Sequence, residues 1–141
     1  QGDEPFIDPK DIENLAQLAK KENANMVTLY SSLGSNDLEN NDVVKLWLDS
    51  NIVKDFSRDV DHLPRKDAKK HIGVYGYKVN FLQKFIKWKQ SKNEIKRNLE
   101  QMRVMDNGEK IYAIESSGKY HIGVDTESDL KQAIEIALDL E

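Results

Sequence analysis

The spacing of apolar residues alternates between helical and strand-like along this chain, and this alternation constrains its fold most. Asp8-Pro9 has the residue types of a helix start, an N-cap followed by proline at the first helical position. Ile12, Leu15 and Leu18 then recur at helical spacing and predict a helix over residues 9–22. Short β-rich runs follow at 25–30, 43–48, 52–56, 72–77 and 110–115.

Three further helices are predicted between and after these strands, over residues 79–88, 94–105 and 126–138. The 43–56 region reads as an antiparallel hairpin that turns at Asp49-Ser50-Asn51, and residues 58–69 as a mobile loop. In the last helix, Ile134, Ala137 and Leu138 are expected to form the buried face. Helices interspersed with strands favour one α/β domain over residues 1–141, with a mixed, mostly parallel sheet flanked by helices.

Composition excludes several function classes. The net charge of −4, with acids and bases interspersed, argues against a nucleic-acid partner, which needs a concentrated basic face. The chain has no cysteine, so it has no disulfide or thiolate nucleophile. No apolar run approaches the roughly 20 residues of a membrane helix, so we expect no membrane association and a cytoplasmic protein.

Two acidic segments stand where ligand sites of α/β proteins occur. Asp3-Glu4 precedes Pro5, and Asp125 precedes the last predicted helix. Sites in open α/β sheets lie beyond the carboxyl ends of strands, and Mg²⁺ prefers oxygen ligands there. Taken singly, each segment could equally be a polar turn with solvated acids.

A third candidate is the strand that holds His71, Tyr75 and Tyr77. These residues share one parity with Gly73, so one face of the strand would present an imidazole and two phenols. Such a face suits a polyhydroxylated sugar, although two half-buried tyrosines of an ordinary strand fit the same pattern. Glu100-Gln101 lies between the apolar Leu99 and Met102 and is predicted on a helix that holds this polar pair rigidly.

Four short motifs, in this order and at this spacing, resemble the CMP-Kdo synthetases (3-deoxy-manno-octulosonate cytidylyltransferases). They are Gln1-Gly2-Asp3-Glu4-Pro5, His71 to Tyr77, Leu99 to Arg103 and Gly123-Val124-Asp125-Thr126. The resemblance implies a nucleotide-diphospho-sugar transferase-like fold. It also implies transfer of a cytidylyl group from CTP to Kdo, an acidic eight-carbon sugar, or its 8-amino analogue, for lipopolysaccharide biosynthesis.

The resemblance also assigns roles to residues. Asp3 and Asp125 would share the catalytic Mg²⁺, and Arg58, in Phe56-Ser57-Arg58, would face the active site. The substrate-binding residues that it implies are Gln1, His71, Tyr75, Tyr77, Glu100 and Gln101. The chain departs from the family at Arg97, where a glutamate is common, which bears on sugar choice or helix packing.

The similarity corresponds to the later part of the family's polypeptide, so we expect a partial domain without the amino-terminal region that grips CTP. Two alternatives stay open: a non-catalytic sugar-binding or dimerisation fragment, and a synthetase of the CMP-sialic-acid type. Family members are homodimers, and the apolar 79–88 segment could serve such an interface or pack within its own domain.

Overall fold

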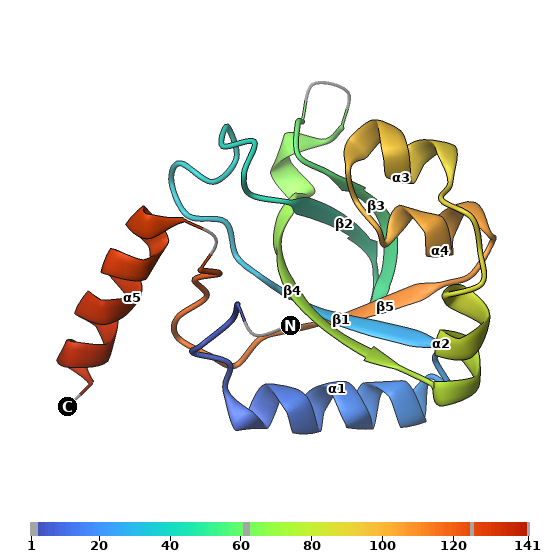
Figure 1. Ribbon diagram of the computed structural model, residues 1–141, viewed down its shortest axis with the longest axis horizontal. Helices are drawn as coiled ribbons and strands as arrows, with labels where there is room; N and C mark the ends of the chain where they lie inside the picture. Colours follow the sequence, from blue (N-terminus) through green and yellow to red (C-terminus); the bar gives the residue numbers. More distant parts are fainter. Residues whose placement is uncertain (1–2, 61–62, 125, 141) are drawn as a thin grey trace.

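The structure is a computed structural model that describes residues 3–60, 63–124 and 126–140. Its five strands pair in the closed order β1-β4-β2-β3-β5, and helices surround this sheet (Figure 1). Among the described residues, no helix is long and apolar enough to cross a membrane. The strands are β1 Met26–Ser31, β2 Lys45–Asp49, β3 Ile52–Ser57, β4 Lys69–Tyr77 and β5 Ile111–Glu115.

The sheet is mixed, as predicted, but the expectation that it is mostly parallel is wrong. Only β1 and β5 pair in parallel, whereas the β1–β4, β2–β3, β2–β4 and β3–β5 pairs are antiparallel. The antiparallel strand β4 carries the chain back to the end of the sheet where β1 begins, since Tyr77 pairs with Met26, and β5 starts at the same end, where Ile111 also pairs with Met26. The sheet closes through a very short pairing, since β3 and β5 pair only at Ile52 and Tyr112.

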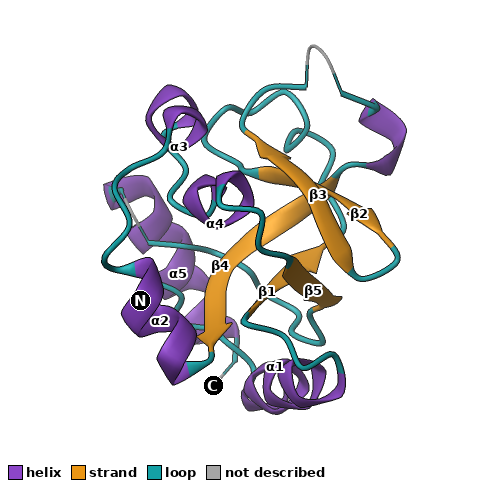
Figure 2. Ribbon diagram, turned by 90° about the vertical axis from the view of Figure 1, so that its right-hand side faces the viewer, coloured by secondary structure: helices purple, strands orange, loops and turns teal. Residues whose placement is uncertain are grey.

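The first helix forms where the sequence predicts it. Helix α1 spans Pro9–Lys21, and the Asp8 carboxylate accepts a hydrogen bond of 2.8 Å from the Lys10 amide. Its buried Leu15 and Leu18 pack with Val27, Leu29 and Ile72 on one side of the sheet. Figure 2 shows α1 below β1 and β5, with α2 (Val79–Phe85) and α4 (Met102–Asp106) on the other side of β4.

The main core lies between the sheet and helices α2 and α4. Phe81 and Phe85 from α2 stack with Tyr77, with ring centroids 6.5 and 6.1 Å apart. On its other face α2 exposes Val79, Leu82 and Ile86. The helix therefore packs within its own domain, and the homodimer interface expected on it stays a prediction.

The predicted helix 94–105 is in fact two helices, α3 (Lys92–Arg97) and α4. Asn98 adopts a left-handed conformation with φ of 53°, which an α-helix cannot accommodate in its interior. Leu99 and Met102 are buried anchors, as predicted. Glu100 and Gln101 therefore lie in the turn between the two helices and not on one continuous helix.

The last helix, α5 (Glu127–Asp139), forms where it is predicted and begins with a capping box, in which Thr126 and Asp129 bond each other's backbone amides. Its expected buried face is wrong, because Ile134 and Leu138 are 51% and 65% exposed and Ala137 is also exposed. Ala133 is the only fully buried residue of α5. Figure 1 shows why, since α5 extends away from the sheet and no described element covers that apolar face.

The segment expected to be a mobile loop, residues 58–69, has its own small core. The indole Nε1 of Trp47 donates a hydrogen bond of 2.7 Å to the Pro64 carbonyl, and Val60 and Ala68 are buried beside this ring. A short 3₁₀ turn, Arg65–Asp67, follows. Apolar contacts of this kind were not evident from a charged stretch that contains one proline.

Candidate functional site

The amino-terminal acidic motif lies against the segment that precedes α5. The Val124 amide donates a hydrogen bond of 2.7 Å to the Asp3 carbonyl. A methyl group added at Gly123 would stand 3.7 Å from the Glu4 carboxylate. The fold thus joins two motifs that are about 120 residues apart in the sequence. Gln1 and Asp125 lie outside the described residues.

The side chain of Asp3 has a buried oxygen atom that could bind a metal ion. Its Oδ1 is a buried oxygen with no hydrogen-bond partner among the residues that the structure describes. A buried carboxylate oxygen without a donor is costly, and a hard cation such as Mg²⁺ would compensate that cost. Within the described ranges, no group of three or more His, Cys, Asp or Glu side chains gathers to form a site. Asp3 could therefore supply one oxygen ligand to Mg²⁺, and other groups would have to supply the rest.

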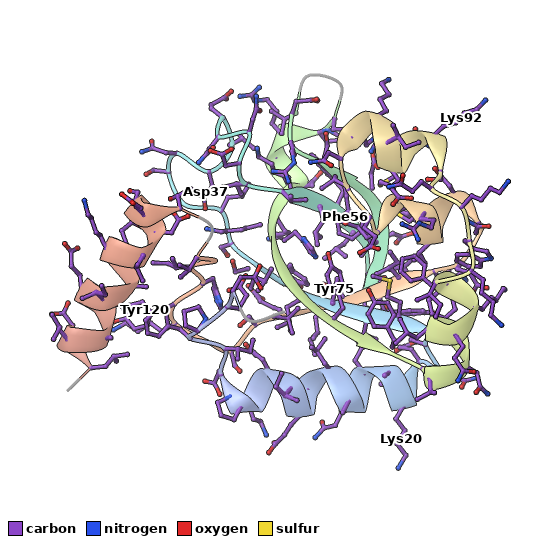
Figure 3. All side chains as sticks on the ribbon, in the orientation of Figure 1. Lys20, Asp37, Phe56, Tyr75, Lys92 and Tyr120 are labelled. Carbon is purple, nitrogen blue, oxygen red and sulfur yellow. The ribbon has the colours of Figure 1, made fainter. Side chains whose placement is uncertain are left out.

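The β4 face carries the imidazole and the two phenols side by side, as the parity of residues 71, 75 and 77 predicts. The ring centroids of His71 and Tyr75 are 5.5 Å apart, and those of Tyr75 and Tyr77 are 6.0 Å apart. Tyr75 lies near the middle of the molecule, beside the concave side of β4 (Figure 3). These three rings form a continuous row that we call the β4 ring row.

A bulge in β4 brings His71 closer to Tyr75 than a regular strand would. Residues four apart in a regular strand are separated by roughly 13 Å. Between Thr28 and Leu29 of β1 the register shifts, so that Tyr75 faces Thr28 while Ile72 faces Leu29. Two residues of β4, Gly73 and Val74, therefore have no paired residue in β1. Because the number of extra residues is even, His71 and Tyr75 still point to the same face of the sheet.

Burial and two acidic residues affect the tyrosines of the β4 ring row. Burial raises the pKa of Tyr75 well above its usual range, and the charges of Glu100 and Asp3 raise it further, together with Tyr77. Burial, with the charge of Glu100, also raises the pKa of Tyr77 to about 12. Both phenols therefore stay protonated at neutral pH and can donate hydrogen bonds. The charge of Glu100 thus acts on both phenols, and that of Asp3 on Tyr75.

His71 is neutral in this setting. Burial lowers the pKa of its imidazole to about 3, because the ring is enclosed by Phe56, Tyr75 and Thr28. The Phe56 ring meets it edge-on, with centroids 5.0 Å apart and planes at 78°. A neutral imidazole carries one N–H donor and one lone pair, which suits a hydroxyl group better than an anion.

Glu100 and Gln101 are held by the helices on either side. The side chain of Glu100 is 66% exposed, whereas Gln101 is buried. Arg103 of α4 forms a buried ion pair with Glu94 of α3 through Nε, at 2.7 Å, and through Nη2. It also approaches Glu100 at 3.5 Å. A hollow of about 390 Å³ opens here, bordered by Glu100 and Arg103.

Arg58 does not bond any member of the acidic and aromatic group in the described structure. Its guanidinium donates to the carbonyls of Asn41 and Asp42, at 3.2 and 3.0 Å. Its own carbonyl accepts a hydrogen bond from the buried ammonium of Lys45. Arg58 thus ties β3 to the loop before β2, and its expected active-site role remains a prediction.

Arg97, the departure from the family pattern, has a structural contact. Its guanidinium pairs with Asp55 and donates to the Phe56 carbonyl, at 2.6 Å, so it ties α3 to β3. This is the effect on helix packing that was one of its two expected consequences.

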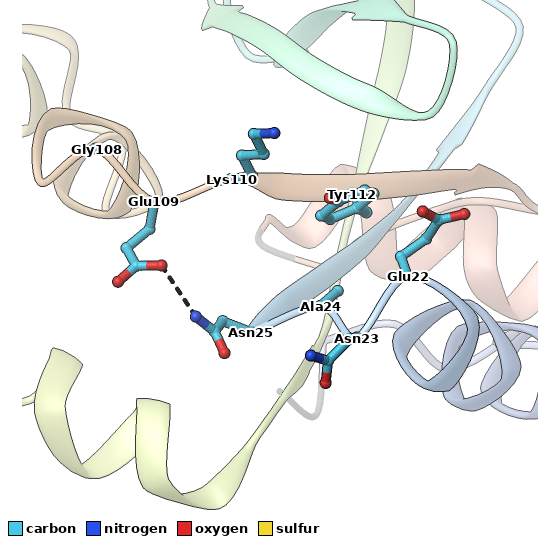
Figure 4. A pocket seen from close by; sticks show the side chains of 8 residues that line it. All are labelled: Glu22, Asn23, Ala24, Asn25, Gly108, Glu109, Lys110 and Tyr112. Carbon is cyan, nitrogen blue, oxygen red and sulfur yellow. Dashed lines mark hydrogen bonds between the residues drawn. The ribbon is translucent and has the colours of Figure 1, made fainter.

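A second hollow lies at the opposite end of the parallel pair β1 and β5, where both strands begin. It has a volume of about 290 Å³ and is lined by Asn23, Asn25, Glu109 and Tyr112, among others (Figure 4). Asn25 donates a hydrogen bond of 2.9 Å to Glu109, which also pairs with Lys84. Asn25 and Glu109 thus bond each other, and none of the described residues of the acidic motifs borders this hollow.

Sequence reasoning missed Thr28, which the structure places behind His71. Its Oγ1 lies 3.0 Å from Nε2 of His71. A signal was available, because Thr28 is a polar residue within the otherwise apolar run Met26-Val27-Thr28-Leu29. A polar side chain in such a run must find a hydrogen-bond partner when it is buried.

Comparisons with known proteins identify the family. A family model described as "Cytidylyltransferase" matches residues 1–111. The 3-deoxy-manno-octulosonate cytidylyltransferase of Idiomarina loihiensis is 36% identical over 155 aligned positions, which cover 99% of this chain and 61% of the relative. The enzyme of the same name from Fusobacterium nucleatum is 38% identical over 141 positions, covering 95% of this chain and 57% of the relative.

A solved structure is similar in three dimensions along the whole chain. It is a CMP:2-keto-3-deoxy-manno-octonic acid synthetase complexed with CTP, 28% identical, with a TM-score of 0.89. The match covers 100% of this chain and 61% of the solved one. The chain thus spans about three fifths of the length of the proteins it resembles.

Proposed function

Since the chain belongs to the cytidylyltransferase family, as its motifs predict, we propose that it carries the sugar-binding part of an enzyme that activates 3-deoxy-manno-octulosonate with CTP. The anomeric hydroxyl of the sugar attacks the α-phosphorus of CTP. A bond forms between this oxygen and phosphorus, the bond from the α-phosphorus to pyrophosphate breaks, and the hydroxyl proton passes to water. The product is a CMP-sugar of the kind that lipopolysaccharide assembly consumes.

The observation that carries the proposal is the β4 ring row, in which the imidazole of His71 and the phenols of Tyr75 and Tyr77 lie side by side. These neutral phenols and this neutral imidazole offer hydrogen-bond donors and a lone pair to a polyhydroxylated sugar. Rings and carboxylates held on strands and between packed helices lose little freedom when the sugar binds. The site therefore suits a sugar with many hydroxyl groups.

The metal part of the proposal rests on Asp3 and Asp125. Support comes from the unpartnered Oδ1 of Asp3 and from the contact of Asp3 with Val124, the sequence neighbour of Asp125. Mg²⁺ held there would neutralise phosphate charge as pyrophosphate leaves.

The sugar site is tested by titrating the protein with the Kdo sugar and measuring the binding affinity by calorimetry. Tyr75→Phe removes one phenolic donor and should weaken binding about tenfold, the effect of losing one hydrogen bond in a buried site. Tyr112→Phe is the matched control, since Tyr112 lines the hollow at the other end of the sheet, and should bind like the unchanged protein. Equal loss in both variants, or none in either, contradicts the assignment.

Pyrophosphate release in the presence of CTP and Mg²⁺ then separates the alternatives. Release with the Kdo sugar supports the cytidylyltransferase, and faster release with sialic acid would identify the CMP-sialic-acid type. Sugar binding without any release, in protein that also carries the family's amino-terminal CTP-binding region, would favour a non-catalytic sugar-binding fragment.

A further inference from the structure

The hydroxyl of Thr28 lies where β4 bulges away from β1. Thr28 is fully buried, and its Oγ1 is 2.9 Å from the Val74 carbonyl oxygen and 3.3 Å from that of Ile72. The same oxygen is 3.0 Å from Nε2 of His71. One hydroxyl group therefore spans the two ends of the bulge and the imidazole beside it.

Counting protons fixes the direction of these bonds. A threonine hydroxyl has one proton to donate, and a carbonyl oxygen can only accept. The two carbonyl contacts take this proton, since an unprotonated pair of oxygens at 2.9 Å would repel each other. Toward His71 the hydroxyl can then only accept, so Nε2 must carry the hydrogen.

A neutral imidazole with its hydrogen on Nε2 has its lone pair on Nδ1. Among the described residues, the contact with Thr28 is the one hydrogen bond of the imidazole ring of His71, so Nδ1 remains available. The ring stands in the β4 ring row beside Tyr75, whose pKa the charges of Glu100 and Asp3 help to raise.

We infer that Thr28 is a positioning residue that holds His71 in the Nε2–H form, so that Nδ1 accepts a hydrogen bond from a hydroxyl of the bound sugar. The tautomer follows from the contacts of Thr28 alone, and the identity of the donor rests on the proposed function. A lone pair at this position repels the oxygen atoms of carboxylates and phosphates. The carboxylate of the sugar and the phosphates of CTP must therefore bind away from His71, and a hydroxyl-bearing part of the sugar must bind against it.

The test uses two variants of Thr28. Thr28→Val has nearly the same shape but no hydroxyl, whereas Thr28→Ser keeps the hydroxyl. The tautomer is read from the ¹⁵N shifts of the imidazole in protein labelled at histidine, without any ligand. We expect the Nε2–H form of His71 in the unchanged protein and in Thr28→Ser, and loss of this preference in Thr28→Val. An Nδ1–H form in the unchanged protein, or the same tautomer in Thr28→Val, overturns the inference.

The second arm measures sugar binding by the same three proteins. Thr28→Val should lower the affinity for the sugar at least about tenfold, while the affinity of Thr28→Ser should stay within about twofold of that of the unchanged protein. A sugar analogue that lacks the hydroxyl bound by Nδ1 should bind to Thr28→Val and to the unchanged protein with equal affinity. If every deoxy analogue does distinguish them, Nδ1 is not the acceptor. If the unchanged protein binds no sugar, the proposed function fails, whereas the tautomer is still decided by the spectrum.

Discussion

Single residues join parts of this chain that are distant in sequence, and Asp11 is the clearest case. It is fully buried in the first turn of α1, and its carboxylate accepts hydrogen bonds from Ser117 N and Oγ, at 2.7 and 2.8 Å, and from Ser116 Oγ. Burial alone would raise the pKa of Asp11, but these hydrogen bonds outweigh it and lower the pKa. Asp11 therefore anchors the segment that leads from β5 toward the acidic motifs.

Asp11→Asn should destabilise the fold by about 2 kcal/mol, because an amide cannot accept all three hydrogen bonds. The measurement is urea unfolding at pH 7. The control is Asp49→Asn at the exposed turn after β2, which should change stability by less than about 0.5 kcal/mol. Similar losses in the two variants would show that Asp11 is not an anchor.

The same carboxylate gives a pH dependence of known sign. Because the folded-state pKa of Asp11 is lowered, its stabilisation is complete above the unfolded value of about 4 and is lost as the pH falls through the folded value. The stability difference between the unchanged protein and Asp11→Asn should therefore shrink on acidification below about pH 4. A difference that grows in acid would contradict this assignment.

Residue types alone predicted the β4 ring row and the Asp8 cap, since both depend on near neighbours in the sequence. They could not predict Asp11 or Thr28, whose partners come from Ser116 and His71 far along the chain. Asp11 looked like an ordinary acid in a first helical turn. Its role depends on tertiary contacts that no local pattern encodes.

At the scale of elements, the break between α3 and α4 decides how Glu100 and Gln101 are presented. The buried pair of Glu94 and Arg103 joins the two helices, and Arg103 lies over the Phe85 ring, 4.8 Å from its centroid. The hydrogen bonds of Arg103 lower the pKa of Glu94. A continuous helix was predicted because apolar residues keep helical spacing through Asn98, whose left-handed backbone no spacing reveals.

Arg103→Met should cost about 3 kcal/mol, since it leaves the buried Glu94 carboxylate without its partner. Lys96→Met, which removes an exposed charge from α3, is the matched control and should have little effect. Thermal and urea unfolding of the two variants check this prediction. If they lose equal stability, the ion pair does not hold α4 in place.

Asn98 offers an independent test of the same break. Asn98→Ala should destabilise the fold by about 1 kcal/mol, because alanine lacks the tolerance of asparagine for the left-handed region, whereas Asn98→Gly should not. Sugar binding by the alanine variant should weaken as well if the turn presents Glu100 to the sugar. A more stable alanine variant would mean that the helices are not interrupted here.

For the whole molecule, the sequence predicted the α/β class and nearly all elements, but not how the strands pair. The closed strand order depends on short strand pairings, such as the single pair of Ile52 and Tyr112 between β3 and β5. The spacing of apolar residues does not reveal such short pairings. The exposure of the apolar face of α5 could not be predicted from the sequence either, because Ile134 and Leu138 have the spacing of an ordinary buried stripe. Periodicity shows that a face is apolar and not what covers it.

This arrangement predicts uneven stability across the molecule. Hydrogen exchange of amides in α5 should be at least about 100-fold faster than in α1, although each helix has 13 residues. The reason is that α1 packs Leu15 and Leu18 against the sheet, whereas α5 buries only Ala133. Equal protection of the two helices would mean that the apolar face of α5 is covered in solution.

The central claim is that acidic residues from the two ends of the chain serve one metal-dependent site. Titration with Mn²⁺, which accepts the same oxygen ligands as Mg²⁺, can be followed by electron paramagnetic resonance. We expect one bound ion whose affinity falls at least about tenfold in both Asp3→Asn and Asp125→Asn and stays unchanged in Asp49→Asn. Binding in either of the first two variants that equals that of the unchanged protein would contradict the account.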